Sequence, residues 1–231
     1  MMDDINSILN DIKKSALTNL FSKDYDLAID DLKKAEMIDQ ENPEILFNLG
    51  IAYSRKGLFK TANEYFTKVL NLNTSYIDSA NVKKNIAFCF IQNKDYDKAI
   101  NILGEVIEDF NSDIQARNMK GYCLEKKGRL KDALKTYREI FHYDRSNINS
   151  LNSSSYLMAL LNIELKSALK IAEFVYKKDK LNPAYNDTLG FVYMKLGNYT
   201  EAEKYFKAAV SMLPFNEEIN DHIKELNSLT D

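Results

Sequence analysis

The chain of 231 residues has no tryptophan and contains only two cysteines, two histidines, three prolines and seven glycines. Proline and glycine are the residues that most often interrupt a helix, and because the chain has so few of them, its composition favours a continuous helical core. No run of 18 apolar residues occurs, so we expect no membrane-spanning helix. The first residues, Met1-Met2-Asp3-Asp4, lack the basic region and apolar core of a signal peptide, which predicts a cytoplasmic protein.

Recognisable catalytic motifs are also missing. The sequence has no glycine-rich phosphate loop, no paired CxxC and no HExxH. His142 and His222 have no nucleophile partner in the pattern, and the carboxylates are spread over helix surfaces. We therefore expect no enzymatic activity, no cofactor and no metal. A net charge of −3 also gives no reason to expect nucleic-acid binding, which requires clustered basic surface.

Alanine recurs at nearly fixed intervals along the chain. The gaps are 34, 37, 34, 35 and 34 residues, and the alanines are Ala28, Ala62, Ala99, Ala133, Ala168 and Ala202. A period near 34 is typical of a helical unit that is repeated and stacked.

Other columns of the repeat support this interpretation. A small residue precedes each alanine by twelve positions: Ala16, Gly50, Ala87, Gly121 and Gly190, with Ser155 one position earlier in the fifth copy. Large apolar residues lie three positions before most alanines and four after, which is the spacing of one helix face. Each copy thus predicts two helices, A and B, and Gly57, Gly128 and Gly197 mark the turn between them in three copies.

These columns resemble the tetratricopeptide repeat family, especially its bacterial multi-repeat members. The sixth copy matches best, at Pro183, Leu189, Gly190, Tyr193, Gly197, Tyr199, Ala202, Phe206, Ala209 and Pro214. The resemblance implies an all-α fold, a right-handed superhelical solenoid of six helix pairs. We expect repeats at about 9–42, 43–76, 80–113, 114–147, 148–182 and 183–215, within one domain over 1–231.

A capping helix is predicted over residues 216–229. Asn216 is suited to begin it, and one face carries Ile219, Ile223, Leu226 and Leu229. A helix that is apolar on one side covers the core that the last repeat would expose. We therefore expect the array to end here and the chain to be a complete protein.

The two cysteines, Cys89 and Cys123, occupy the same slot in successive A helices. We interpret them as small buried apolar residues. A disulfide between them is not expected in a reducing compartment.

Helix A lines the concave groove in proteins of this family, and the slot after the small residue points into it. Here that slot is always apolar or aromatic, with Phe47 on the same face: Leu17, Ile51, Phe88, Tyr122, Tyr156 and Phe191. Two interpretations remain open. The side chains either pack between adjacent A helices as core, or form an apolar stripe that binds a partner.

Polar residues are expected at the rim of the groove, and the set leans basic. The candidates for partner binding are Asn48, Arg55, Lys84, Asn85, Lys126 and Lys195. Charges at a rim mainly affect association rate and specificity.

The favoured function is a non-enzymatic scaffold or adaptor that binds a helix or extended peptide of a partner protein in this groove. The alternative is a structural or assembly subunit of a larger bacterial machine for secretion or motility, which uses the convex B helices and the ends. Either way we expect protein or peptide partners, without nucleic acid, membrane insertion or a small-molecule substrate. Apolar residues exposed on B helices would favour the alternative.

Overall fold

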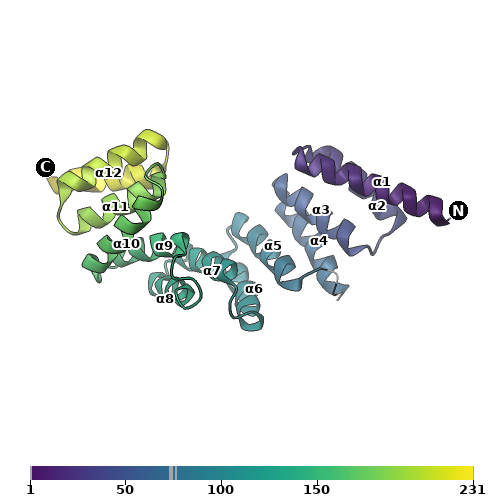
Figure 1. Cartoon of the computed structure of the whole chain (residues 1–231), viewed down its shortest axis with the longest axis horizontal. Helices are drawn as coiled ribbons and strands as arrows, with labels where there is room; N and C mark the ends of the chain where they lie inside the picture. Colours follow the sequence, from purple (N-terminus) through teal and green to yellow (C-terminus); the bar gives the residue numbers. More distant parts are fainter. Residues whose placement is uncertain (1, 73–74, 76, 231) are drawn as a thin grey trace. The chain divides into compact units, whose positions relative to one another are not determined.

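The computed structural model describes residues 2–72, 75 and 77–230. Over these residues it has thirteen α-helices and no strand, which confirms the predicted helical repeat solenoid (Figure 1). The helices are α1 (Met2–Phe21), α2 (Tyr25–Ile38), α3 (Pro43–Arg55), α4 (Phe59–Asn71), α5 (Ser79–Gln92), α6 (Tyr96–Asp109), α7 (Ile114–Lys126), α8 (Leu130–Ile140), α9 (Ile148–Leu160), α10 (Leu165–Lys178), α11 (Pro183–Lys195), α12 (Tyr199–Met212) and α13 (Glu217–Thr230). None of these helices combines the length and apolarity needed to cross a bilayer.

The chain divides into two compact units, Met1–Cys123 and Leu124–Asp231. In the first unit, each helix from α1 to α6 packs on the next one in sequence. The second unit repeats this order from α8 to α13, and α9 also contacts α11. Contacts between sequence neighbours are typical of stacked repeats. The single domain and the repeat boundaries stay predictions, and residues 73, 74 and 76 of the linker before α5 lie outside the described residues.

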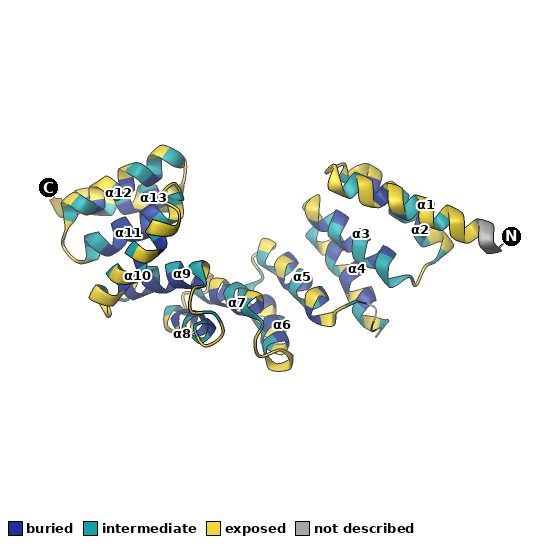
Figure 2. Cartoon of the chain, viewed as in Figure 1, coloured by how far each residue is buried: buried dark blue, intermediate teal, exposed yellow. Residues whose placement is uncertain are grey.

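The recurring alanines lie in the interior of the protein. All six are fully buried, at 0% exposure: Ala28, Ala62, Ala99, Ala133, Ala168 and Ala202. Figure 2 shows buried positions along the sides of the helices that face their neighbours. Ser155, which replaces the small apolar residue in the fifth copy, is also buried, and its hydroxyl donates to the Asn152 carbonyl oxygen at 2.9 Å. This hydrogen bond satisfies a polar group that would otherwise be costly to bury.

The cysteines are buried, as the sequence predicts. Cys89 and Cys123 are both at 0% exposure. Burial raises the pKa of Cys89 to about 11 and that of Cys123 to about 12. Both therefore remain thiols at neutral pH, and thiols are poor nucleophiles and metal ligands.

The turn between helices A and B requires a left-handed residue in every repeat. Gly57, Gly128 and Gly197 supply it with φ of 82°, 72° and 79°. In the other repeats Lys23, Lys94 and Asn162 adopt φ of 66°, 60° and 55°. A side chain costs about 1–2 kcal/mol in this conformation. The turn is therefore set by the packing of the two helices, and the two repeats with lysine at this position carry local backbone strain, because asparagine adopts the conformation more readily.

Replacing Lys94 by glycine should raise the free energy of unfolding by about 0.5–1 kcal/mol, because the relief of strain exceeds the added flexibility of the unfolded chain. Urea denaturation measures the change. Asn93→Gly is the matched control, because Asn93 already has a φ of −82° and gains nothing. A Lys94→Gly protein no more stable than wild type would show that the turn is unstrained.

Candidate functional site

The first unit contains a groove along its A helices. Its apolar lining is Ile51, Phe88, Ile91, Met119 and Tyr122, and its polar lining is Ser54, Arg55, Asn81, Lys84, Asn85, Gln92, Gln115 and Asn118. A second hollow shares Ile51 and Arg55 with it and adds Leu17 and Phe21 from α1. These two shared residues therefore lie between the hollows. Asn48 and Phe47, from the same helix as Ile51, are half-buried and do not line either hollow.

The predicted stripe residues of this unit are neither core nor fully exposed. Leu17, Phe88 and Tyr122 are 38%, 40% and 41% exposed. The Phe88 ring meets Phe59 edge-to-face at 6.1 Å, and the Tyr122 ring meets Tyr96 in the same way at 6.5 Å. Phe47 packs more deeply, 5.7 Å from the fully buried Phe66. Each of the two groove rings thus contacts a neighbouring ring while part of its surface faces solvent.

The rim of this groove is less basic than the list of its residues suggests. Lys84 forms an ion pair with Asp113 at 2.8 Å, and both side chains are largely buried. Although burial opposes it, the Lys84 ammonium and the Ala116 N–H hold the pKa of Asp113 below its usual value. The charge of Lys84 is therefore balanced inside the protein. The Asn85 amide donates to the Asn81 carbonyl oxygen at 2.9 Å, and Arg55 is exposed.

Phe191 corrects the prediction for the second unit. It occupies the stripe slot but is only 1% exposed, so it is not available to a partner. His222 of α13 lies 4.5 Å from its ring and Tyr156 lies 5.0 Å from it. The reason is that α13 packs over the last repeat and covers this slot, whereas Tyr156 stays half-buried at its edge.

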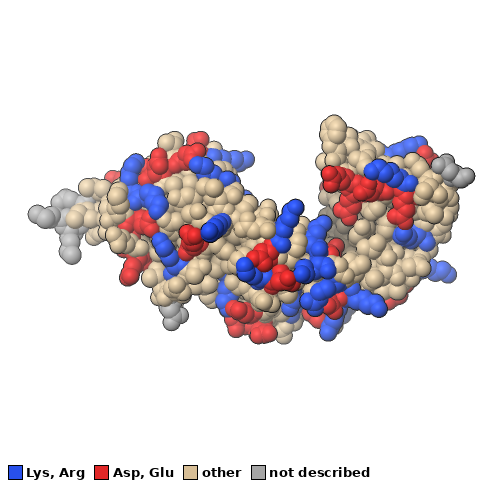
Figure 3. Space-filling view, turned by 180° about the vertical axis from the view of Figure 1, so that it is seen from behind, with Lys and Arg blue, Asp and Glu red and all other residues tan. Residues whose placement is uncertain are grey.

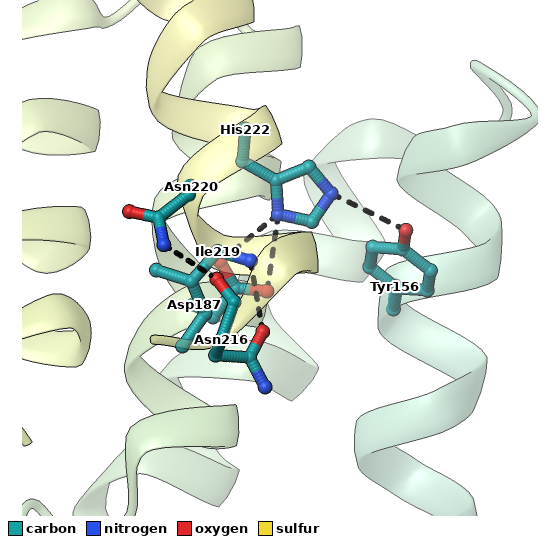
Figure 4. Close-up of polar contacts among 6 residues, drawn as sticks. All are labelled: Tyr156, Asp187, Asn216, Ile219, Asn220 and His222. Carbon is teal, nitrogen blue, oxygen red and sulfur yellow. Dashed lines mark hydrogen bonds and ion pairs between the residues drawn. The ribbon is translucent and has the colours of Figure 1, made fainter. Parts of the chain in front are cut away.

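A buried polar network anchors α13 (Figure 4). The Nδ1 atom of His222 is 2.9 and 3.1 Å from the two carboxylate oxygens of Asp187, and its Nε2 atom is 3.4 Å from the Tyr156 hydroxyl. Burial raises the pKa of Asp187, and the hydrogen bond from His222 partly opposes this shift. Burial also raises the pKa of Tyr156. The network is a packing contact that joins α9, α11 and α13.

Sequence reasoning missed this network because it assigned the buried face of the capping helix to aliphatic residues only. Ile219 and Leu226 are buried as expected, but Leu229 is 49% exposed and His222 is buried in its place. Asn216 does begin the helix, with its side chain accepting from the Ile219 N–H at 3.0 Å. The spacing of His222 and Asp187, close to one repeat period, was the available signal.

The rim residues of the second unit are differently placed. Lys195 pairs with Glu225 of α13 at 2.7 Å and lies over the Phe191 ring, 4.9 Å from its centre. Lys126 is exposed near the end of α7. Lys195 thus helps hold the capping helix, and its availability to a partner is reduced.

Family models match three stretches of the chain. The model described as "TPR repeat" matches residues 22–57, and "Tetratricopeptide repeat" matches residues 183–216. A third, "Anaphase-promoting complex, cyclosome, subunit 3", matches residues 55–140. The chain belongs to the tetratricopeptide repeat family.

Known proteins resemble parts of this tetratricopeptide repeat protein. It is 26% identical over 148 residues to the protein O-mannosyl-transferase Tmtc3 of Drosophila melanogaster, covering 63% of this chain and 15% of that protein. It is also 26% identical over 165 residues to the TPR repeat-containing protein MJ1428 of Methanocaldococcus jannaschii, covering 68% of this chain and 28% of that one. The chain therefore spans only a minor part of these two relatives.

Solved structures show the same fold. PilW, a widely conserved type IV pilus biogenesis factor, superposes with a TM-score of 0.74 at 17% identity, over 94% of this chain and 98% of its own. YrrB, a TPR protein with an unusual peptide-binding site, gives a TM-score of 0.62 at 17% identity, over 84% and 97%. At this identity the likeness concerns the fold alone.

Proposed function

We propose that the groove of the first unit binds an amphipathic helix or extended peptide of a partner protein. The tetratricopeptide repeat fold is in general a non-enzymatic scaffold for protein–protein interaction. The observation that carries the proposal is the pair Phe88 and Tyr122, about 40% exposed yet each held at one edge by a neighbouring ring. Rings already fixed in place lose little conformational entropy when a partner covers them.

The surroundings of these rings suit a peptide. Asparagine and glutamine side chains at the groove both donate and accept hydrogen bonds, as a partner's polar groups require: Asn81, Asn85, Gln92, Gln115 and Asn118. An apolar centre with a polar margin is the usual anatomy of a protein interface. YrrB, which shares the fold, has a peptide-binding site, and this supports the same use here. We place the protein in the cytoplasm as part of this proposal.

Changing Phe88 and Tyr122 together to serine should weaken partner binding about thirtyfold or more, because aromatic anchors at an interface centre commonly contribute about 2 kcal/mol or more. A partner captured from the source cells by the wild-type chain is identified by mass spectrometry. Its affinity for each variant is then measured by calorimetry. Thermal unfolding of the same proteins reports whether the change acts on binding or on folding.

Phe110→Ser is the matched control, since it removes a ring that is 47% exposed at the end of α6 and outside the groove. It should leave the affinity unchanged. If the double variant is strongly destabilised, the rings belong to the core and the proposal fails. If it folds normally and still binds with full affinity, the partner uses another surface.

The alternative, an assembly subunit of a larger machine, has its own support. B helices expose apolar side chains: Leu27 and Met37 on α2 are 56% and 73% exposed, and Phe174 on α10 is 41% exposed. PilW, a pilus biogenesis factor, shares the fold. Cross-linking in source cells, followed by comparison of wild type with Leu27→Ser/Met37→Ser, tests this role. A large cross-linked complex that forms with wild type and is lost in this variant would favour the alternative.

A further inference from the structure

Charge is unevenly distributed within the second unit. Residues 124–182 carry twelve Lys and Arg against seven Asp and Glu, whereas residues 183–231 carry four against eight. Figure 3 shows Asp and Glu side chains gathered toward the C-terminal end of the chain. The net charge of −3 over the whole chain conceals this division, so composition alone gives no sign of a basic surface.

Three of these basic side chains line a groove between α8 and the turn that joins α9 to α10. We call this the basic groove, and it is lined by Lys131, Leu134, Lys135, Arg138, Glu139, His142, Leu161 and Ile163. Positions 131, 135 and 138 are spaced by four and three residues, so their side chains share one side of α8, and His142 follows in the turn after this helix. The basic groove lies wholly in the second unit and shares no residue with the groove of the first.

The floor of the basic groove is apolar and its margin is charged. Leu134 is buried, whereas Ile163 is 38% exposed and Leu161 is half-buried. Lys131 and Lys135 are both exposed. Arg138 forms an ion pair with Glu164 at 3.1 Å, so part of its charge is balanced within the protein. The positive potential is therefore concentrated toward Lys131 and Lys135, beside uncovered aliphatic surface.

We propose that the basic groove binds an acidic amphipathic helix of a partner protein. Apolar residues of that helix would cover Ile163 and Leu161, and its carboxylates would face Lys131 and Lys135. Complementary charge gives such contacts their specificity and speed of association. A helix whose apolar residues recur every three or four positions fits a groove with an apolar floor.

The composition of the basic groove favours a protein over a nucleic acid. Glu139 lines it and Glu164 borders it through Arg138, and both carboxylates would repel phosphates. None of the lining side chains named above is a phenylalanine, tyrosine or tryptophan on which a base could stack. The apolar floor would also stay uncovered under a phosphate backbone. The surface is independent of the groove in the first unit, so either proposal can fail without the other.

Fluorescence anisotropy with the full chain tests the proposal. The probe is a labelled helical peptide of about five turns, roughly 18 residues, with leucines on one face and glutamates on the other. A scrambled peptide of the same composition, polyglutamate of the same length and an oligothymidylate serve as competitors. We expect the amphipathic peptide to bind about tenfold more tightly than the other three, and binding to weaken as salt is raised.

The variants separate the basic groove from general positive charge. Lys131→Glu/Lys135→Glu should weaken binding of the amphipathic peptide by about tenfold or more. Lys166→Glu/Lys170→Glu makes the same charge change at the same spacing on α10, at exposed positions outside the groove, and should change affinity less than about twofold. Ile163→Ser should weaken binding of the amphipathic peptide but not binding of polyglutamate. Circular dichroism checks that each variant is folded.

Several results would overturn the proposal. One is that the amphipathic peptide does not bind at about 1 mM, the weak limit of useful affinity. Another is that polyglutamate or oligothymidylate binds equally tightly. The third is that the two charge-reversal variants lose the same amount of affinity. Light scattering tests whether a second copy of the chain occupies the basic groove. Self-association of wild type that Lys131→Glu/Lys135→Glu abolishes would assign the surface to a second copy of the chain instead.

Discussion

Deleting residues 216–231 should lower the free energy of unfolding substantially. The deletion removes α13, whose Ile219 and Leu226 are each 3% exposed. Two buried aliphatic side chains contribute about 1.5–3 kcal/mol each, so we expect a loss of about 3–6 kcal/mol, measured by urea denaturation. The truncation also exposes Phe191 and leaves the buried Asp187 carboxylate without His222, which adds to the cost.

The loss should be concentrated in the second unit, because each repeat contacts mainly its neighbours. Hydrogen exchange should therefore show faster opening of α11 and α12 than of α3 and α4. Leu229→Ser in the full chain is the control, since Leu229 lies on the same helix but is 49% exposed, and it should be nearly neutral. A truncated protein that melts at the wild-type temperature and remains monodisperse would show that α13 is not a cap.

Gly190→Ala should destabilise the protein by about 1–3 kcal/mol, the usual cost of overpacking a core. A Cβ atom at Gly190 would lie 2.8 Å from the Phe206 ring and 3.2 Å from the backbone oxygen of Ala202. Phe206 is 1% exposed and cannot rotate away, and the backbone of α12 cannot shift without disturbing α13. The added methyl therefore costs more than the better helix propensity of alanine restores.

Gly104→Ala is the matched comparison, with the opposite expected sign. A Cβ there would meet only the Lys120 Nζ atom, at 3.8 Å. The substitution should stabilise α6 by about 0.5–1 kcal/mol because alanine is the better helix former. Chemical denaturation of both variants measures the difference. Two changes of the same sign would mean that Gly190 does not mark a close approach of α11 and α12.

The repeat architecture could be predicted because every copy repeats the same packing problem. Ala62 and Ala202 are fully buried since a methyl group alone fits between adjoining helices, and any chain with this geometry shows the same column. The turn is a partial exception. Glycine at position 57 predicts the left-handed backbone of the turn, but Lys94 adopts the same conformation although lysine does not predict it.

The candidate sites were less predictable, because exposure depends on what covers a slot. Phe88 and Phe191 occupy the same position in the repeat, yet one is 40% exposed and the other 1%. Nothing in their local sequence distinguishes them, since the difference comes from α13 packing over the second. Lys84 likewise looks like a free rim cation until the fold brings Asp113 within 2.8 Å.

The period near 34 residues and its apolar columns thus determine the helices, their pairing and the buried alanines, because these features follow from local spacing and side-chain size. Partners of polar groups across repeats do not follow from spacing. Asp187 with His222, and the gathering of Lys131 and Lys135 beside Ile163, depend on which helix faces meet after the repeats stack. Burial and electrostatics are properties of that three-dimensional neighbourhood, so only the packed structure decides them.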